Sequence, residues 1–155
     1  MNDIQELVDL LTSSQLRVST GLWLLPLEYI GNEEDEAHRL GIEPIDIRTR
    51  LLQSLPEGTK FSGLTPDSIF SLIDKESQES GDWPGVMIYN LDLLISRLTS
   101  TDQAIIWQDL FTALPHRRRG VLLTIPETAE NLFPSKEIIN ELTKEHRIIK
   151  TNPTK

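Results

Sequence analysis

The sequence contains no cysteine, fewer basic than acidic residues, and no long apolar run. Of its 155 residues, 24 are Asp or Glu and 15 are Lys or Arg, which gives a formal net charge of −9. The absence of cysteine excludes disulfides, thiolate metal sites and cysteine nucleophiles. The negative charge argues against duplex DNA or RNA as the main partner, because phosphate binding normally requires a basic surface.

Targeting, membrane and metal-binding signals are also missing. The apolar runs are far shorter than the roughly 20 residues that a bilayer-spanning helix needs, so we expect no membrane segment. The N-terminal stretch Met1–Leu11 carries acids and no basic cluster, so we expect no signal peptide and a cytoplasmic protein. The histidines lie far apart, at His38, His116 and His146, and we therefore expect no metal site.

The pattern of apolar residues predicts an α/β domain. With 38% hydrophobic and 25% charged residues, the chain can form a substantial core. Short apolar or alternating runs predict five strands, at Leu22–Leu25, Ile42–Ile47, Val86–Tyr89, Gly120–Pro126 and His146–Lys150. Helical patterns between them imply parallel pairing and right-handed crossovers. We predict one three-layer α/β/α domain with a mainly parallel five-stranded sheet, comprising an N-terminal helix (1–14), a core (15–150) and a flexible tail (151–155).

Helix signals separate these strands. Helical spacing or capping residues predict helices at Asp3–Leu11, Gly31–Leu40, Arg48–Leu55, from Thr65 to Lys75, from Thr101 to Pro115, and at Lys136–Lys144. Apolar residues at this spacing, among them Leu52, Leu55, Ile105 and Leu114, are expected to face the core.

Two polar residues follow Val86–Tyr89, which we expect to be the central strand of the sheet. Asn90 and Asp92 lie just beyond its end, and in open α/β sheets ligands bind outside the carboxyl ends of the strands. Both are therefore candidate ligand-binding residues. Each also has a simpler interpretation, Asn90 as a turn former and Asp92 as a helix or turn cap. The pattern identifies no catalytic residue.

A local basic run stands out against the acidic background. It consists of His116, Arg117, Arg118 and Arg119, and it could contact nucleic acid or an acidic partner, or supply an arginine finger. The alternative is that these side chains are solvated and interact with the dipole at a helix C-terminus.

From Leu22 to Ile149 the order of elements resembles a P-loop NTPase core of the additional-strand, AAA-like kind. Leu22–Leu25 corresponds to the strand before the phosphate loop, and Val86–Asn90 corresponds to the Walker B strand. Val121–Thr124 corresponds to the sensor-1 strand. The resemblance implies a P-loop-like topology, and a flavodoxin-like strand order is the alternative.

Two further features belong to this resemblance. The phrase Tyr89–Leu94 is similar to the Asp-Asp-Leu-Asp-Leu-Leu type of ending of many Walker B strands. The layout is also similar to that of the small P-loop protein of BREX phage-defence operons. By its place at the end of the sensor strand, Thr124 becomes a third candidate ligand-binding residue.

The residues that bind and hydrolyse ATP in that family are absent here. A phosphate loop needs Gly-x-x-x-x-Gly-Lys-Ser/Thr, whereas Pro26–Glu36 has one glycine, no lysine and four consecutive acids. Each close pair of like charges would add roughly 1 kcal/mol of repulsion toward a triphosphate even in water. Tyr89 and Asn90 stand where the Walker B acids would be. The resemblance therefore implies a domain that has lost ATP hydrolysis and ATP binding, and we expect no cofactor.

Three functional hypotheses follow. The first is a non-catalytic interaction or regulatory module of a larger complex, with a protein partner, in phage defence if the BREX resemblance holds. The second is a nucleic-acid or nucleotide-binding module that uses the basic run 116–119. The third is a small hydrolase of unrecognised type in which Asp46 and Asp92, each at the end of a strand, converge.

Overall fold

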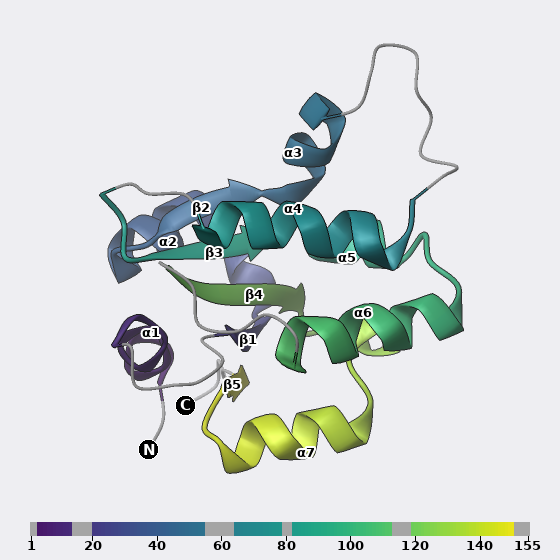
Figure 1. The fold of residues 1–155 in the computed structure, drawn as a ribbon. Coiled ribbons are helices and arrows are strands. Elements are labelled where there is room, and N and C mark those ends of the chain that lie inside the picture. The colour runs from purple at the N-terminus through teal and green to yellow at the C-terminus, as the bar shows by residue number, and fades with distance from the viewer. Residues whose placement is uncertain (1–2, 14–19, 55–63, 79–81, 113–118, 151–155) are drawn as a thin grey trace.

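The computed structural model describes residues 3–13, 20–54, 64–78, 82–112 and 119–150 (Figure 1). These residues form strands separated by helices, with two helices in succession after β2 and again after β3. The helices are α1 (Ile4–Thr12), α2 (Glu33–Leu40), α3 (Ile47–Ser54), α4 (Pro66–Gln78), α5 (Leu91–Ile95), α6 (Ser100–Thr112) and α7 (Lys136–Lys144). The strands are β1 (Thr20–Leu25), β2 (Glu43–Asp46), β3 (Gly85–Tyr89), β4 (Gly120–Pro126) and β5 (Ile148–Lys150).

The strands form one five-stranded sheet in the order β2-β3-β4-β1-β5, and every neighbouring pair is parallel. The predicted α/β class and the parallel sheet are confirmed. The middle strand is β4, not β3, so the expectation that Val86–Tyr89 is the central strand was wrong. The flavodoxin-like alternative, with the order 2-1-3-4-5, is also excluded, because β4 lies between β1 and β3.

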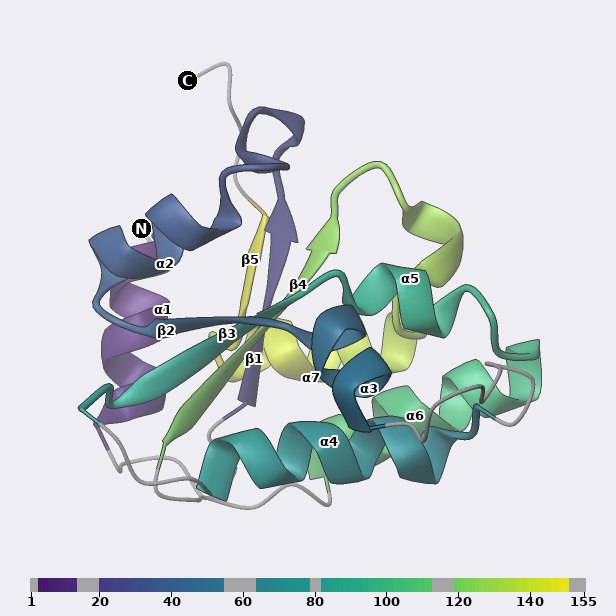
Figure 2. The same cartoon turned by 90° about the horizontal axis from the view of Figure 1, so that it is seen from above.

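Helices cover both faces of this sheet (Figure 2). On one face α1 and α2 pack over Trp23, Met87 and Leu122, which point away from the other helices. On the opposite face α3 to α7 enclose a larger apolar cluster that includes Leu22 and Leu123. Side chains alternate between the faces along each strand, so strands covered on both sides must be apolar at nearly every position. This is why β1 and β4 appear in the sequence as unbroken apolar runs.

The capping signals agree with the structure at several helix ends. The Asp3 carboxylate accepts a hydrogen bond from the N–H of Glu6 at 2.8 Å, and Ser135 Oγ accepts one from the N–H of Ile138 at 3.3 Å. Gly41 ends α2 with a φ of 78°, a left-handed conformation that favours glycine. These contacts fix where α1, α2 and α7 begin or end.

The N-terminal helix belongs to the same packed unit as the sheet. Leu7, Val8 and Leu11 are buried in the cluster that α1 shares with α2 and the strands. Gly120 lies so close to α1 that a Cβ there would be 2.5 Å from the main-chain oxygen of Leu11. Glycine at the start of β4 therefore allows the helix to approach the strand.

Some side chains predicted to face the core lie on the surface instead. Leu52 on α3 is 45% exposed and Ile105 on α6 is 43% exposed, while their neighbours Leu51 and Ile106 are buried. Leu55 and Leu114 lie outside the described residues. The sequence pattern also missed α5 as a separate helix, because one and a half turns are too short for a helical period. Within the described ranges, no helix has the length and apolar character needed to cross a membrane.

Candidate functional site

The carboxyl edge of the sheet is where the sequence places the candidate site. Because the strands are parallel, β1, β2, β3 and β4 all end at this edge, and the segments that follow them lie next to one another (Figure 2). Acidic side chains gather there, from the start of α2, from the end of β2 and from α5.

The segment between β1 and α2 is the one that the sequence resemblance compares with a phosphate loop. Pro26 ends the strand, and a 3-10 turn at Leu27–Tyr29 leads to Gly31, which has a φ of 92°. The N–H of Gly31 donates a hydrogen bond to Glu33 Oε1 at 2.9 Å, and Glu33 is only 8% exposed. A carboxylate of the chain itself thus accepts the hydrogen bond from a main-chain N–H of this loop. Main-chain N–H groups are the donors with which a phosphate loop binds its ligand.

The first turn of α2 adds further negative charge. It contains Glu33, Glu34, Asp35 and Glu36. Among the described residues, Glu36 is the one of these four acids that has a basic partner, with Arg39 Nε at 2.7 Å. Acids in a first turn stabilise the helix through its dipole, but they also repel an anion that approaches the same helix end.

Tyr89 ends β3 and lies within the field of these acids. Burial, together with the smaller effects of the charges on Glu34, Asp46 and Glu33, raises the pKa of Tyr89 to about 12. Its phenol therefore stays protonated and neutral at physiological pH. A neutral phenol at the end of β3 cannot hold Mg²⁺ or activate water as a carboxylate does.

Asn90 and Asp92 shape the turn after β3. Asn90 adopts a left-handed conformation with a φ of 64°, which asparagine tolerates better than most residues, and its main chain begins α5. Asp92 lies in the first turn of α5, and burial raises its pKa above the usual range while main-chain N–H groups oppose this shift. The conformation of Asn90 agrees with its interpretation as a turn former. Asp92 was expected as a helix or turn cap, but Asn90 is the residue at the cap position of α5, and Asp92 lies inside the first turn.

Thr124 and Asp46 are engaged within the fold. Thr124 is 2% exposed, and its Oγ1 donates a hydrogen bond to the main-chain oxygen of Ile88 at 2.9 Å, which ties β4 to β3. The Asp46 carboxylate accepts hydrogen bonds from the N–H groups of Arg48 and Thr49, so it caps α3. In the part of the chain that the structure describes, no hydrogen bond joins Asp46 to Asp92. Nor do the described residues contain a group of three or more His, Asp or Glu side chains placed to hold a metal ion.

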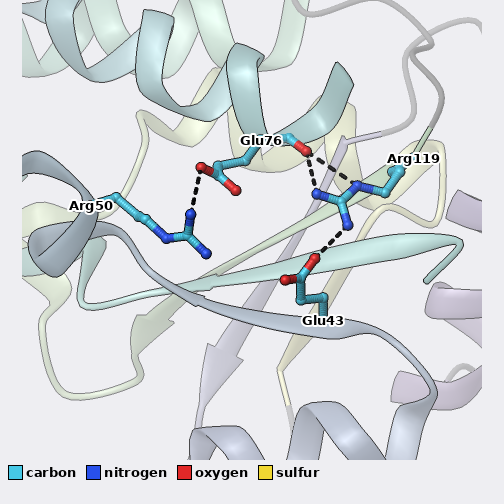
Figure 3. Close-up of polar contacts among 4 residues, drawn as sticks. All are labelled: Glu43, Arg50, Glu76 and Arg119. Carbon is cyan, nitrogen blue, oxygen red and sulfur yellow. Dashed lines mark hydrogen bonds and ion pairs between the residues drawn. The ribbon is translucent and has the colours of Figure 1, made fainter. Parts of the chain in front are cut away.

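The basic run divides between described and undescribed residues. His116, Arg117 and Arg118 lie outside the described residues, whereas Arg119 is buried and 4% exposed. Its guanidinium donates to the main-chain oxygen of Glu76 through Nε at 3.2 Å and Nη2 at 2.6 Å, near the C-terminus of α4 (Figure 3). Arg119 is therefore not part of an exposed basic patch, and the dipole that it meets belongs to α4.

Arg119 also joins a network of charges inside the fold. The Arg119 Nη1 atom forms an ion pair with Glu43 Oε1 at 2.5 Å (Figure 3). The Glu76 carboxylate is almost fully buried and forms an ion pair with Arg50 Nη1 at 3.3 Å. This network joins the start of β2, the end of α4, the start of β4 and α3. Its role is structural, because the helix and strand ends that it connects leave main-chain carbonyls to be satisfied.

Sequence reasoning missed two features. The hydrogen bond from Gly31 to Glu33 could not be foreseen, because a run of acids in a first turn is normally solvated. A groove between α6 and α7 was also missed. Its walls come from segments that are far apart in the sequence, and only the spacing of three glutamates along α7 hinted at a continuous acidic side.

Comparisons with known proteins identify no relative. No protein-family model, no curated protein and no solved structure matches this chain.

Proposed function

We propose that this chain is a non-catalytic interaction or regulatory module with P-loop-like topology that works within a larger complex. The carrying observation is the hydrogen bond of 2.9 Å from the N–H of Gly31 to the Glu33 carboxylate. The loop after β1 holds a negative group of its own, followed by more acids, where an ATPase would hold phosphate. Such a loop disfavours nucleotide binding for two reasons: the Gly31 N–H already donates to Glu33, and the acidic side chains repel the phosphates.

The order of the strands supports the P-loop-like part of the proposal. In an additional-strand P-loop core, the sensor strand lies between the strand of the phosphate loop and the Walker B strand. Here β4 lies between β1 and β3, the strands that the resemblance assigns to those roles. The similarity of layout to the small P-loop protein of BREX operons suggests a phage-defence assembly as the setting.

The two other hypotheses have less support. Arg119 cannot contribute to a nucleic-acid site on the basic run, because its guanidinium already binds the Glu76 main-chain oxygen and the Glu43 carboxylate. A hydrolase that uses Asp46 and Asp92 would need both carboxylates free to act on one substrate, but Asp46 already caps α3. Neither receives a supporting contact from the described residues.

Thermal unfolding with ATP, ADP and GTP, with and without Mg²⁺, tests the proposal. A ligand at a hundredfold excess over its dissociation constant stabilises by about 2.7 kcal/mol. For a chain of this size that corresponds to a rise in Tm of roughly 5–10 °C. We expect no rise with any nucleotide.

A matched pair of variants locates any binding that does occur. Glu34→Lys/Asp35→Lys changes the first turn of α2, and Glu137→Lys/Glu141→Lys makes the same change in charge on α7, on the opposite face of the sheet. A nucleotide-dependent rise in Tm that responds only to the α2 variant would place a nucleotide at the loop and refute the proposal. ATP hydrolysis that disappears on Asp92→Asn would refute it as well.

A further inference from the structure

A groove lies between α6, α7 and the start of β5, away from the carboxyl edge of the sheet. It has a volume of about 530 Å³ and adjoins a second hollow of about 220 Å³, which shares Gln108, Ser135 and Ile138 with it. Figure 1 shows α6 and α7 on the same side of the molecule, with β5 near one end of α7. We call this surface the α6–α7 groove; its main part is lined by Gln108, Phe111, Thr112, Ser135, Glu137, Ile138, Glu141, Leu142, Glu145 and Arg147.

The α6–α7 groove combines an apolar floor with an acidic rim. Phe111 and Leu142 are buried beneath it, and Ile138 is half-buried. Glu137, Glu141 and Glu145 are exposed and follow one another every four residues, so they form a row along one side of α7. The contact of Glu141 with Lys144 Nζ is 3.5 Å between two well-exposed side chains, and such a pair is weak and leaves the rim negative.

Arg147 lies at the inner end of the groove and is 5% exposed. Its Nε donates to the main-chain oxygen of Thr20 at 2.8 Å, and its Nη1 pairs with Glu145 Oε1 at 2.6 Å. The guanidinium also lies 5.9 Å from the centre of the Phe111 ring. Its buried Nη2 has no hydrogen-bond partner among the described residues, although an enclosed donor normally has one. The groove thus has a cation beneath it that can donate one more hydrogen bond.

We propose that the α6–α7 groove binds a basic, amphipathic peptide segment of a partner protein. Apolar side chains of the segment pack on the half-buried Ile138, above Phe111 and Leu142, and its Lys or Arg side chains pair with Glu137 and Glu141. A main-chain carbonyl of the segment accepts the hydrogen bond from Arg147, once the half-exposed Glu145 side chain moves aside. A basic peptide matches both the negative rim and the positive guanidinium. Its Lys or Arg side chains pair with the glutamates, and its main-chain carbonyls are neutral acceptors for Arg147. A free anion would satisfy Arg147 but would be repelled by the row of glutamates.

The inference rests on the proposed function only in that the ligand is a protein, and it is tested by peptide binding. The probe is a fluorescently labelled synthetic peptide with Leu and Lys in a helical amphipathic pattern, and its twin has Glu in place of Lys. We expect the Lys peptide to bind the full chain in anisotropy titrations and the Glu twin not to bind. Glu137→Lys/Glu141→Lys should weaken binding about tenfold through the loss of two surface charge contacts. Glu34→Lys/Asp35→Lys, which changes the net charge equally on the opposite face, should leave the affinity unchanged.

Several outcomes would overturn the inference. They are the absence of binding up to about 1 mM peptide, equal weakening by the two variants, and equal affinity for the two peptides. The Nε–Hε signal of Arg147 in ¹⁵N NMR tests the contact with the guanidinium without a substitution in the core. It should shift when the Lys peptide is added, and an unmoved signal during saturable binding would remove Arg147 from the site. A nucleotide-induced rise in Tm would refute the proposed function and would leave these peptide results unaffected.

Discussion

Replacing Arg119 by alanine should destabilise the fold strongly. The side chain is 4% exposed and makes two hydrogen bonds to the main-chain oxygen of Glu76 as well as the ion pair with Glu43 (Figure 3). Removing one partner of a buried ion pair costs about 3–5 kcal/mol. The Glu43 side chain is 32% exposed and keeps part of its hydration, so the lower end of that range applies, about 3 kcal/mol. Tm should fall by roughly 6–12 °C.

Urea denaturation followed by tryptophan fluorescence measures this loss directly. The midpoint should fall while the m-value stays unchanged, because the native state remains equally compact. Arg39→Ala is the matched control, since it also removes one arginine from an ion pair. Arg39 is 55% exposed and its partner Glu36 is 12% exposed, so solvent screens the pair from the arginine side, and its loss should cost about 1 kcal/mol. If Arg119→Ala cost no more than Arg39→Ala, the guanidinium would be solvated, and the original prediction of an exposed basic patch that includes Arg119 would stand.

Two further substitutions test residues at the carboxyl edge. Thr124→Val should lower the free energy of unfolding by about 1 kcal/mol in the same urea assay, because it removes the buried hydrogen bond to Ile88. The control Thr143→Val removes an exposed hydrogen bond to Ile139 within α7 and should change the free energy of unfolding little. Equal effects of the two substitutions would contradict a structural role for the Thr124 hydroxyl. Tyr89 should ionise in the native protein only near pH 12, its shifted pKa. Because the unfolded chain loses this proton near pH 10, stability should fall as pH rises between about 10 and 12. Tyrosinate absorbance and unfolding curves of the wild type and of Tyr89→Phe measure both effects, and a fall of the same size in the Tyr89→Phe variant would show that another group is responsible.

Local signals in the sequence were sufficient for most of the elements. Gly120–Pro126 and Lys136–Lys144 were predicted with the boundaries that the structure has. Unbroken apolar runs identify buried parallel strands, and a capping serine before an amphipathic stretch identifies a helix start. The strand β2 lies at an edge of the sheet, where Pro44 is tolerated because proline lacks the N–H that an inner strand would need.

The relations between elements were harder to predict. The position of β4 in the middle of the sheet is set by packing between segments that are distant in sequence, and nothing local in Gly120–Pro126 distinguishes it from β3. Leu52 and Ile105 were misplaced because each sits beside another apolar residue, and the helical pattern alone did not decide which of the two faces the core. The assignment of Asn90, Asp92 and Thr124 as ligand-binding residues stays a prediction. The decisive contact, from Gly31 to Glu33, depends on the folded shape of a turn.

The charged residues inside the fold contribute little to the net charge of the surface. Arg119 and Arg147 are both almost fully buried, and both donate to main-chain carbonyls, those of Glu76 and Thr20. Both guanidinium groups bind main-chain carbonyls at the ends of strands and helices, and they contribute little to the electrostatic field at the protein surface. Among the described residues three acids are buried as well, namely Glu33, Glu36 and Glu76, while Glu34, Asp35, Glu137, Glu141 and Glu145 are exposed. The buried charges therefore nearly balance one another, and the excess of acids behind the formal charge of −9 lies on exposed side chains. A polyanion such as nucleic acid would meet repulsion over most of this surface, whereas a partner protein with a basic segment would be attracted to it.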